Sequence, residues 1–347
     1  MVPTDDQKAL VFDALVENGL RFIEAAASEL ASEPTFSVAH FATGLELLLK
    51  ARLFAEHWTL IAANPHGFNW SAVQSGDVYT IQASDICAAV ATVAGTSLNH
   101  EQEVFARVFR HRNQVLHFVP PTNLSAVEAE QCLAWYRLHH LLTVRWRDVF
   151  LKFAARIQTV ESSLRAHRPY LKARYDVLQP KLSGLSAAGA LAECPSCNFM
   201  SAELERPIRT IAKFTCEVCG ADGHLAEFSC GNRHPLYELP AECQCGEEHT
   251  REELFESLNV VRYLSPKEQL DEPEPPHCGE CLDSEVTVAE LESDAGYVCV
   301  ACGTYFEPTA YDSCEYCSTG WVGYDLESSF FSGCEFCDGR LGNLPDD

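Results

Sequence analysis

Apolar residues in the first half of the chain recur at the three- and four-residue spacing of amphipathic α-helices. Stretches rich in Asn, Gly, Ser and Pro interrupt this pattern, as loops between helices do. The predicted helices cover residues 5–31, 35–63, 84–94, 99–118 and 125–166, and the longest predicted loop covers 64–80. The pattern therefore predicts an N-terminal α-helical bundle.

Two positions in this half have the spacing of a capping box at a helix start. Asn99 is followed three residues later by Gln102, and Ser125 is followed three residues later by Glu128. The bundle is expected to end in a linker over 180–193, where one Pro, two Gly and two Ser break the helical pattern.

The residue pattern changes after the linker, where helical periodicity ends and paired cysteines begin. Fifteen of the 17 cysteines lie in this half, mostly in C-x-x-C units. A short helix over 250–262 and a stiff acidic linker over 271–276 are also predicted. We therefore expect a helical domain over 1–183 and two pairs of small, β-rich zinc modules over 184–265 and 266–347.

The paired cysteines favour zinc over disulfides, because the chain has no apparent signal peptide. A structural zinc takes four ligands in a tetrahedron, so two C-x-x-C knuckles complete one site. Three such pairs, with 16 to 18 residues between knuckles, are Cys194/Cys197 with Cys216/Cys219, Cys278/Cys281 with Cys299/Cys302, and Cys314/Cys317 with Cys334/Cys337. These predict zinc ribbons. A cross-braced pairing of the last four knuckles would use the same eight ligands and stays open.

A fourth site has irregular spacing. Its predicted Cys₃His ligands are Cys230, His234, Cys243 and Cys245. His249 is the alternative to His234. We expect about four structural Zn²⁺ ions, since closed four-ligand shells lack the open position of a catalytic zinc. Cys87 and Cys132 stand alone on predicted helices, where they are expected to be small buried side chains.

Charge is distributed unevenly. Residues 1–190 carry a net charge of −1 and residues 191–347 a net charge of −24, whereas the stretch 107–181 carries +8. Phosphate contacts need Lys and Arg, so the zinc half is a poor nucleic-acid ligand and suits solubility, protein binding or autoinhibition better. It could also cover the basic stretch as an RNA mimic.

Hydropathy indicates neither a membrane span nor a secretory leader. No apolar run approaches about 20 residues. The first residues lack the basic and apolar regions of a signal peptide. A cytoplasmic protein that does not bind membranes is expected.

The most informative motif lies at the end of the predicted helix 99–118. It reads Arg110-His111-Arg112-Asn113-Gln114-Val115-Leu116-His117-Phe118. Asn113 and His117 are four residues apart and share a helix face. The earlier helix reads Gly44-Leu45-Glu46-Leu47-Leu48-Leu49-Lys50-Ala51. Together, the R-N-x-x-x-H string and this leucine-rich helix with Glu46 and Lys50 resemble the HEPN superfamily of helical domains, over about residues 5–170.

The resemblance implies an all-α, dimeric domain, and in many members a metal-independent endoribonuclease whose site forms at the interface of a homodimer. It implies that His117 acts as general acid or base, Arg112 stabilises the phosphate, and Asn113 orients His117 or the phosphate. Glu46 and Lys50 would line the same cleft. The products would be RNA ends with a 2′,3′-cyclic phosphate. The analogy further suggests a toxin or antiviral-defence effector, with the zinc half sensing a partner or regulating the nuclease.

Simpler roles remain open for each of these residues. His117 could complement the helix dipole, Arg112 could make an ordinary salt bridge, and Glu46 with Lys50 could be a stabilising i,i+4 pair. A non-catalytic HEPN and zinc-ribbon scaffold is therefore the alternative function. A regulatory nucleic-acid-binding zinc protein is a further rival, disfavoured by the acidic zinc half.

Overall fold

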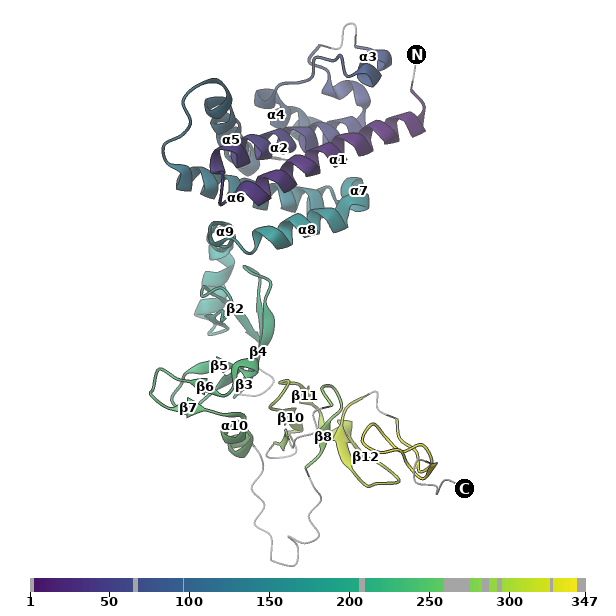
Figure 1. Ribbon diagram of the computed structural model, residues 1–347, viewed down its shortest axis with the longest axis vertical. Helices are drawn as coiled ribbons and strands as arrows, with labels where there is room; N and C mark the ends of the chain where they lie inside the picture. Colours follow the sequence, from purple (N-terminus) through teal and green to yellow (C-terminus); the bar gives the residue numbers. More distant parts are fainter. Residues whose placement is uncertain are drawn as a thin grey trace, which may run out of the picture. The chain divides into compact units, whose positions relative to one another are not determined.

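The chain forms two compact units, Met1–Gln179 and Pro180–Asp347 (Figure 1). The computed structural model describes residues 3–64, 68–95, 97–205, 210–258, 275–282, 287–291, 295–324 and 327–341. The first unit thus ends at Gln179 and the second begins at Pro180. Helix α9 (Arg168–Ala187) runs across this boundary, so most of the predicted linker 180–193 is helical rather than extended.

The first unit is helical, as the apolar periodicity predicts. Its helices before α9 are α1 (Asp5–Glu29), α2 (Pro34–Glu56), the 3₁₀ turn η1 (Trp58–Ile61), α3 (Trp70–Ser75), α4 (Ala83–Val93), α5 (Asn99–His117), α6 (Leu124–His140), α7 (Arg147–Phe150), the 3₁₀ turn η3 (Leu151–Phe153) and α8 (Ala154–Leu164). The predicted loop 64–80 contains α3, which Asn69 caps by accepting a hydrogen bond from the Ala72 N–H.

The predicted helix 125–166 is not continuous. A π-helical turn, Leu141–Arg145, follows α6, and the Trp146 N–H donates to the Leu141 carbonyl at 2.7 Å. The side chains of Trp146 and Phe150 beyond it are buried in the same core as those before it. The buried face therefore persists through the interruption, which is why periodicity did not reveal it.

Helix α2 is the centre of this unit and packs against α1, α4, α5 and α6. Helices α1 and α2 lie side by side (Figure 1), and two glycines lie where they contact each other. A Cβ atom added at Gly44 would lie 2.7 Å from the Gly19 carbonyl oxygen and 2.8 Å from the Ile23 side chain. Only glycine fits there without displacing α1.

A buried polar network fastens α9 to the rest of the bundle. The Glu161 carboxylate on α8 is fully buried. It accepts hydrogen bonds from Trp135 Nε1 at 2.9 Å, Tyr170 Oη at 2.5 Å and Arg174 Nη1 at 2.6 Å. Arg165 adds a fourth donor at 3.2 Å. Buried charge is tolerated when it is paired and hydrogen-bonded in this way.

The second unit is built from short strands. They are β1 (Leu191–Glu193), β2 (Met200–Glu205), β3 (Ile211–Cys216), β4 (Asp222–Glu227), β5 (Arg233–Pro235), β6 (Ala241–Glu242), β7 (Glu248–His249), β8 (His277–Cys278), β9 (Val288–Glu290), β10 (Tyr297–Cys299), β11 (Tyr305–Phe306), β12 (Tyr311–Ser313) and β13 (Gly320–Val322). Strands β1 to β5 form an antiparallel meander, and three smaller sheets have the orders β11-β10-β9, β12-β13-β8 and β6-β7.

Two 3₁₀ turns, η4 (Leu236–Glu238) and η7 (Pro308–Ala310), and helix α10 (Arg251–Leu258) complete the described elements of this unit. Helix α10 begins where the predicted helix 250–262 does. The remainder of that prediction, and most of the predicted linker 271–276, lie outside the described residues.

The cysteine-rich segments of the second unit pack against one another through shared apolar side chains and a shared strand pairing. One hydrophobic cluster joins Ile211 and Ala226 of the first meander, Leu254 of α10, Val298 of β10, and Val300, which follows β10. A second junction is the parallel pairing of β8 with β13, where Trp321 lies opposite His277. Segments before and after residues 265/266 therefore share packed side chains.

Two further expectations concern the helical unit. Cys87 and Cys132 are buried, and burial raises the pKa of each thiol to about 12, so both remain protonated small apolar side chains. Of the helices in the described part of the chain, none combines the length and apolar character needed to cross a membrane.

Candidate functional site

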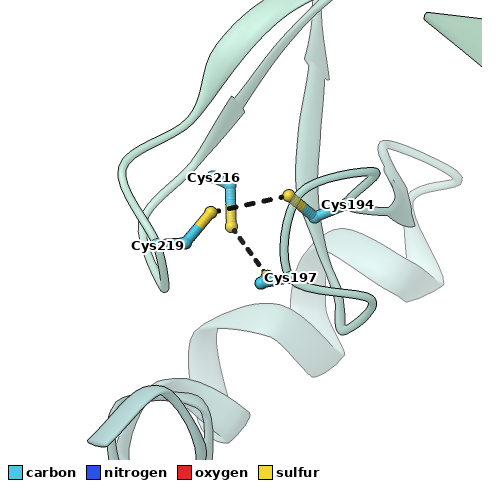
Figure 2. Close-up of side chains that lie close together, drawn as sticks. All are labelled: Cys194, Cys197, Cys216 and Cys219. Atoms are coloured by element: carbon cyan, nitrogen blue, oxygen red, sulfur yellow. Dashed lines mark hydrogen bonds between the residues drawn. The ribbon is translucent and has the colours of Figure 1, made fainter. Parts of the chain in front are cut away.

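The first cysteine cluster brings together the knuckle after β1 and the knuckle at the end of β3 (Figure 2). Cys194 Sγ lies 3.6 Å from Cys219 Sγ, and Cys197 Sγ lies 3.8 Å from Cys216 Sγ. A tetrahedral zinc with Zn–S bonds of about 2.3 Å places its sulfurs about 3.8 Å apart. The four sulfurs thus have the separation that a zinc ion requires.

The last two clusters have the same geometry. The sulfur–sulfur distances are 3.7 Å for Cys278–Cys302, 3.8 Å for Cys281–Cys299, 3.8 Å for Cys314–Cys337 and 3.9 Å for Cys317–Cys334. Each cluster pairs knuckles that are consecutive in the sequence. The cross-braced alternative is therefore not the arrangement found.

Five of the C-x-x-C knuckles share one backbone turn, which positions their two sulfurs. The residue after the second cysteine donates its N–H to the carbonyl of the first cysteine, at 2.7 to 3.0 Å. That residue is left-handed in every case, with positive φ at Asn198, Gly220, Leu282, Gly303 and Ser318. The sixth knuckle differs, since Cys334 and Cys337 exchange backbone hydrogen bonds with each other. Spacing alone gave no sign of this difference.

The second cluster corrects one predicted ligand. It consists of Cys230, Cys243, Cys245 and His249, so His249 takes the place expected for His234. His249 Nε2 lies 3.3 Å from Cys230 Sγ and 3.7 Å from Cys245 Sγ. Its Nδ1 lies 2.9 Å from a carboxylate oxygen of Glu253. A carboxylate on the far nitrogen is the usual partner of a zinc-bound histidine, because it fixes the tautomer and the ring orientation.

The donor chemistry of the four clusters fits about four zinc ions. Three or four sulfurs held this closely would repel one another as thiolates, and a divalent cation offsets that repulsion. Each cluster offers four ligand atoms within 4.8 Å of one another. With four protein ligands, each shell is closed, which is typical of a structural zinc.

The helical unit brings together four of the five residues expected at the motif. Glu46 on α2 accepts from Lys50 Nζ at 2.5 Å and from Arg112 Nη1 on α5 at 2.6 Å. All three side chains are largely buried, at 11 to 19% exposure. Burial acts to raise the pKa of Glu46, but the hydrogen bonds from Lys50 and Arg112 outweigh it and lower that pKa. Glu46 is therefore an ionised carboxylate shared by two cations.

Asn113 extends this group in a way that differs from the expected role. Its Oδ1 accepts from both Nε and Nη2 of Arg112, each at 3.3 Å, so it orients the guanidinium. Beside the group is an open hollow of about 610 Å³ between α2, α4 and α5. Its polar lining includes Glu46, Thr80, Gln82, Ser84, Gln102, Arg110, Arg112 and Asn113. The lining residues that lie before and within α4 follow no sequence motif, so the sequence could not have identified them as part of this hollow.

His117 stands apart from that hollow. It is the last residue of α5, and its side chain is exposed. Within the described residues, its imidazole makes no hydrogen bond or ion pair. Around it the apolar side chains of Leu116, Phe118 and Val119 are 57%, 82% and 61% exposed.

Much of the basic stretch 107–181 is neutralised from outside that stretch. Arg156 pairs with Glu17 and Glu24 of α1, Arg145 with Glu101, and Arg112 with Glu46. Charge summed along the sequence therefore overstates the positive surface in this unit.

Searches against protein-family models, curated proteins and solved structures found no match to this chain. The resemblance to HEPN domains thus rests on the R-N-x-x-x-H motif and the helix that carries Glu46 and Lys50.

Proposed function

We propose that this protein is a metal-independent endoribonuclease of HEPN type, acting as a toxin or antiviral-defence effector, with a zinc-ribbon half that senses a partner or regulates the nuclease. One observation carries the proposal. Glu46 and Asn113 hold the Arg112 guanidinium at the rim of an open polar hollow. A fixed cation on a hollow of this size suits a phosphate and its flanking nucleotides.

The group is poised to receive an anion. Glu46 carries one negative charge against the two positive charges of Lys50 and Arg112, so the trio has a net charge of +1. Arg112 can stabilise the charge that grows on the phosphate oxygens as the phosphorus becomes five-coordinate. Because its pKa is lowered, Glu46 is ionised at neutral pH and is a positioning residue for Arg112, not a proton donor.

His117 supplies the proton transfer in this proposal. The imidazole removes the proton from the ribose 2′-hydroxyl as that oxygen attacks the phosphorus, or returns one to the departing 5′-oxygen. The P–O5′ bond breaks, leaving a 2′,3′-cyclic phosphate on one product and a 5′-hydroxyl on the other. His117 lies one helical turn after Asn113, on the same side of α5.

A homodimer through the helical half would complete the site. The exposed apolar side chains of Leu116, Phe118 and Val119 at the end of α5 support an interface beside His117. A second copy there would bury these side chains and bring a second His117 to the same cleft.

The decisive experiment compares RNA cleavage by the wild type with cleavage by His117→Ala and Arg112→Ala. Controls on the same helix are His100→Ala, another exposed histidine, and Arg107→Ala, another ion-paired arginine. Each protein is checked for zinc content and helicity, then tested on purified RNA and by expression in growing cells. Loss of at least 100-fold in the motif variants alone supports the proposal, whereas equal behaviour of all five proteins rejects it.

A non-catalytic interaction scaffold is the second candidate. The buried Glu46 contacts favour it, because the ion pair with Arg112 at 2.6 Å can serve solely to join α2 to α5, and the pair with Lys50 at 2.5 Å lies within α2 itself. It predicts that Arg112→Ala weakens the fold of the helical unit while the protein has no nuclease activity at any stage.

A further inference from the structure

The second zinc cluster has one more potential ligand than it needs. His249 completes the group of Cys230, Cys243 and Cys245. His234 nevertheless lies against it, with its ring centre 5.8 Å from that of His249. Its Nε2 atom is buried and has no hydrogen-bond partner. A buried polar nitrogen without a partner is costly, and neutral imidazole nitrogen is a common zinc ligand.

Both imidazoles also rest on the same aromatic side chain. Phe228 stacks on His249 with ring centres 4.1 Å apart and 9° between the planes. It meets His234 edge-on at 6.0 Å. Removal of the His249 ring would leave a space on Phe228 that His234 can turn into. His234 is carried by β5, which pairs with β4, so its backbone is already held beside the cluster.

We propose that His234 is a reserve ligand of the second zinc site, entering the shell when one of the four primary donors is lost. The primary donors include the exposed Cys230 and Cys245, which solvent-borne oxidants and alkylating agents can reach. With His234 in reserve, the site would keep its zinc as Cys₃His or Cys₂His₂ after such a loss. Among the described residues, the first cluster has no histidine in a comparable position.

The test is zinc stoichiometry of the purified full chain, measured by elemental analysis with helicity as the folding control. His249→Ala should retain four zinc ions, because His234 replaces the lost nitrogen. His249→Ala combined with His234→Phe should retain three, since Phe preserves the ring contacts with Phe228 but offers no donor. His234→Phe alone should retain four. Cys219→Ser in the first cluster should retain three and shows what an unreplaced loss looks like.

Three zinc ions in His249→Ala would overturn the proposal, and so would four in the double variant. If His249→Ala does not fold, the same comparison is made with Cys245→Ser, alone and with His234→Phe. There, retention of four ions by the single variant and three by the double is expected. Zinc release to a chromogenic chelator gives a second measurement, expected to be at least tenfold faster from each double variant than from its single parent. None of these measurements depends on nuclease activity.

Discussion

The fully buried Glu161 offers a demanding test of how the helical unit is held together. Replacement by Gln keeps the shape of the side chain but removes the charge that faces Arg174 at 2.6 Å. The new amide also points an N–H group toward one of the existing donors. Breaking a buried ion pair by changing one partner typically costs about 3–5 kcal/mol. We expect Glu161→Gln to lower the free energy of unfolding of this unit by that amount.

Tyr170→Phe is the matched comparison. It removes one hydrogen bond to Glu161 and leaves the carboxylate with the donors of Trp135, Arg174 and Arg165. The expected loss is smaller, about 1–3 kcal/mol. Both can be measured by urea unfolding at fixed zinc concentration, followed by tryptophan fluorescence, because all the tryptophans except Trp321 lie in the helical unit. A loss below about 1 kcal/mol for Glu161→Gln would refute the argument that the network is a net attachment for α9.

The same group makes a pH prediction. Burial acts to raise the pKa of Glu161, but the surrounding positive charges and hydrogen-bond donors outweigh it and lower that pKa. The unfolded value is about 4.3. A lowered folded-state pKa means that the stabilisation is complete above the unfolded value and is lost as the pH falls through the folded one. The stability difference between wild type and Glu161→Gln should therefore shrink progressively below about pH 4.3.

Three further predictions concern helix α2 and the third zinc module. Gly44→Ala should destabilise the helical unit by about 1–3 kcal/mol in urea unfolding, because its Cβ meets α1, whereas Gly184→Ala, which meets nothing within 4 Å, should not. Leu282→Gly should stabilise the third zinc module by about 1 kcal/mol in thermal unfolding, because Leu282 has a left-handed φ of +51°, which glycine adopts without a steric cost. No gain in stability would mean that Leu282 is unstrained. Glu46→Gln should flatten the fall of stability with acidification below about pH 4.3, because the folded-state pKa of Glu46 is lowered; an unchanged pH profile would contradict this.

The fold class of each half could be predicted from the sequence because each half has one repeating pattern of residues. Apolar spacing located α1, α2, α4 and α5, and the C-x-x-C spacing grouped the cysteines of three clusters. The first residues and caps of the helices were harder to predict. The expected cap Asn99 is already inside α5, because the Gln102 N–H donates to the Leu98 carbonyl. The start of α6 is capped by Asn123, two residues before the expected Ser125.

The two candidate histidine ligands of the second cluster show which information residue spacing cannot supply. Cys230-x₃-His234 and Cys245-x₃-His249 have the same separation, so spacing could not rank the two histidines. In the fold, His249 Nε2 lies 3.3 and 3.7 Å from two cysteine sulfurs, and its Nδ1 contacts Glu253, which is four residues later on the next helix, α10. Carboxylates at that distance are common in acidic sequences, and only the fold distinguishes a partner of the ligand from a surface charge.

The parallel pairing of β8 with β13 also constrains how the zinc half is made. His277 and Cys278 acquire their strand partner only when Trp321 and Val322 have been synthesised. A chain still on the ribosome therefore carries the third cluster's first knuckle with one strand edge open. Unpaired edges and free thiols invite association with other chains and oxidation. For this reason, early zinc capture should raise the yield of folded protein.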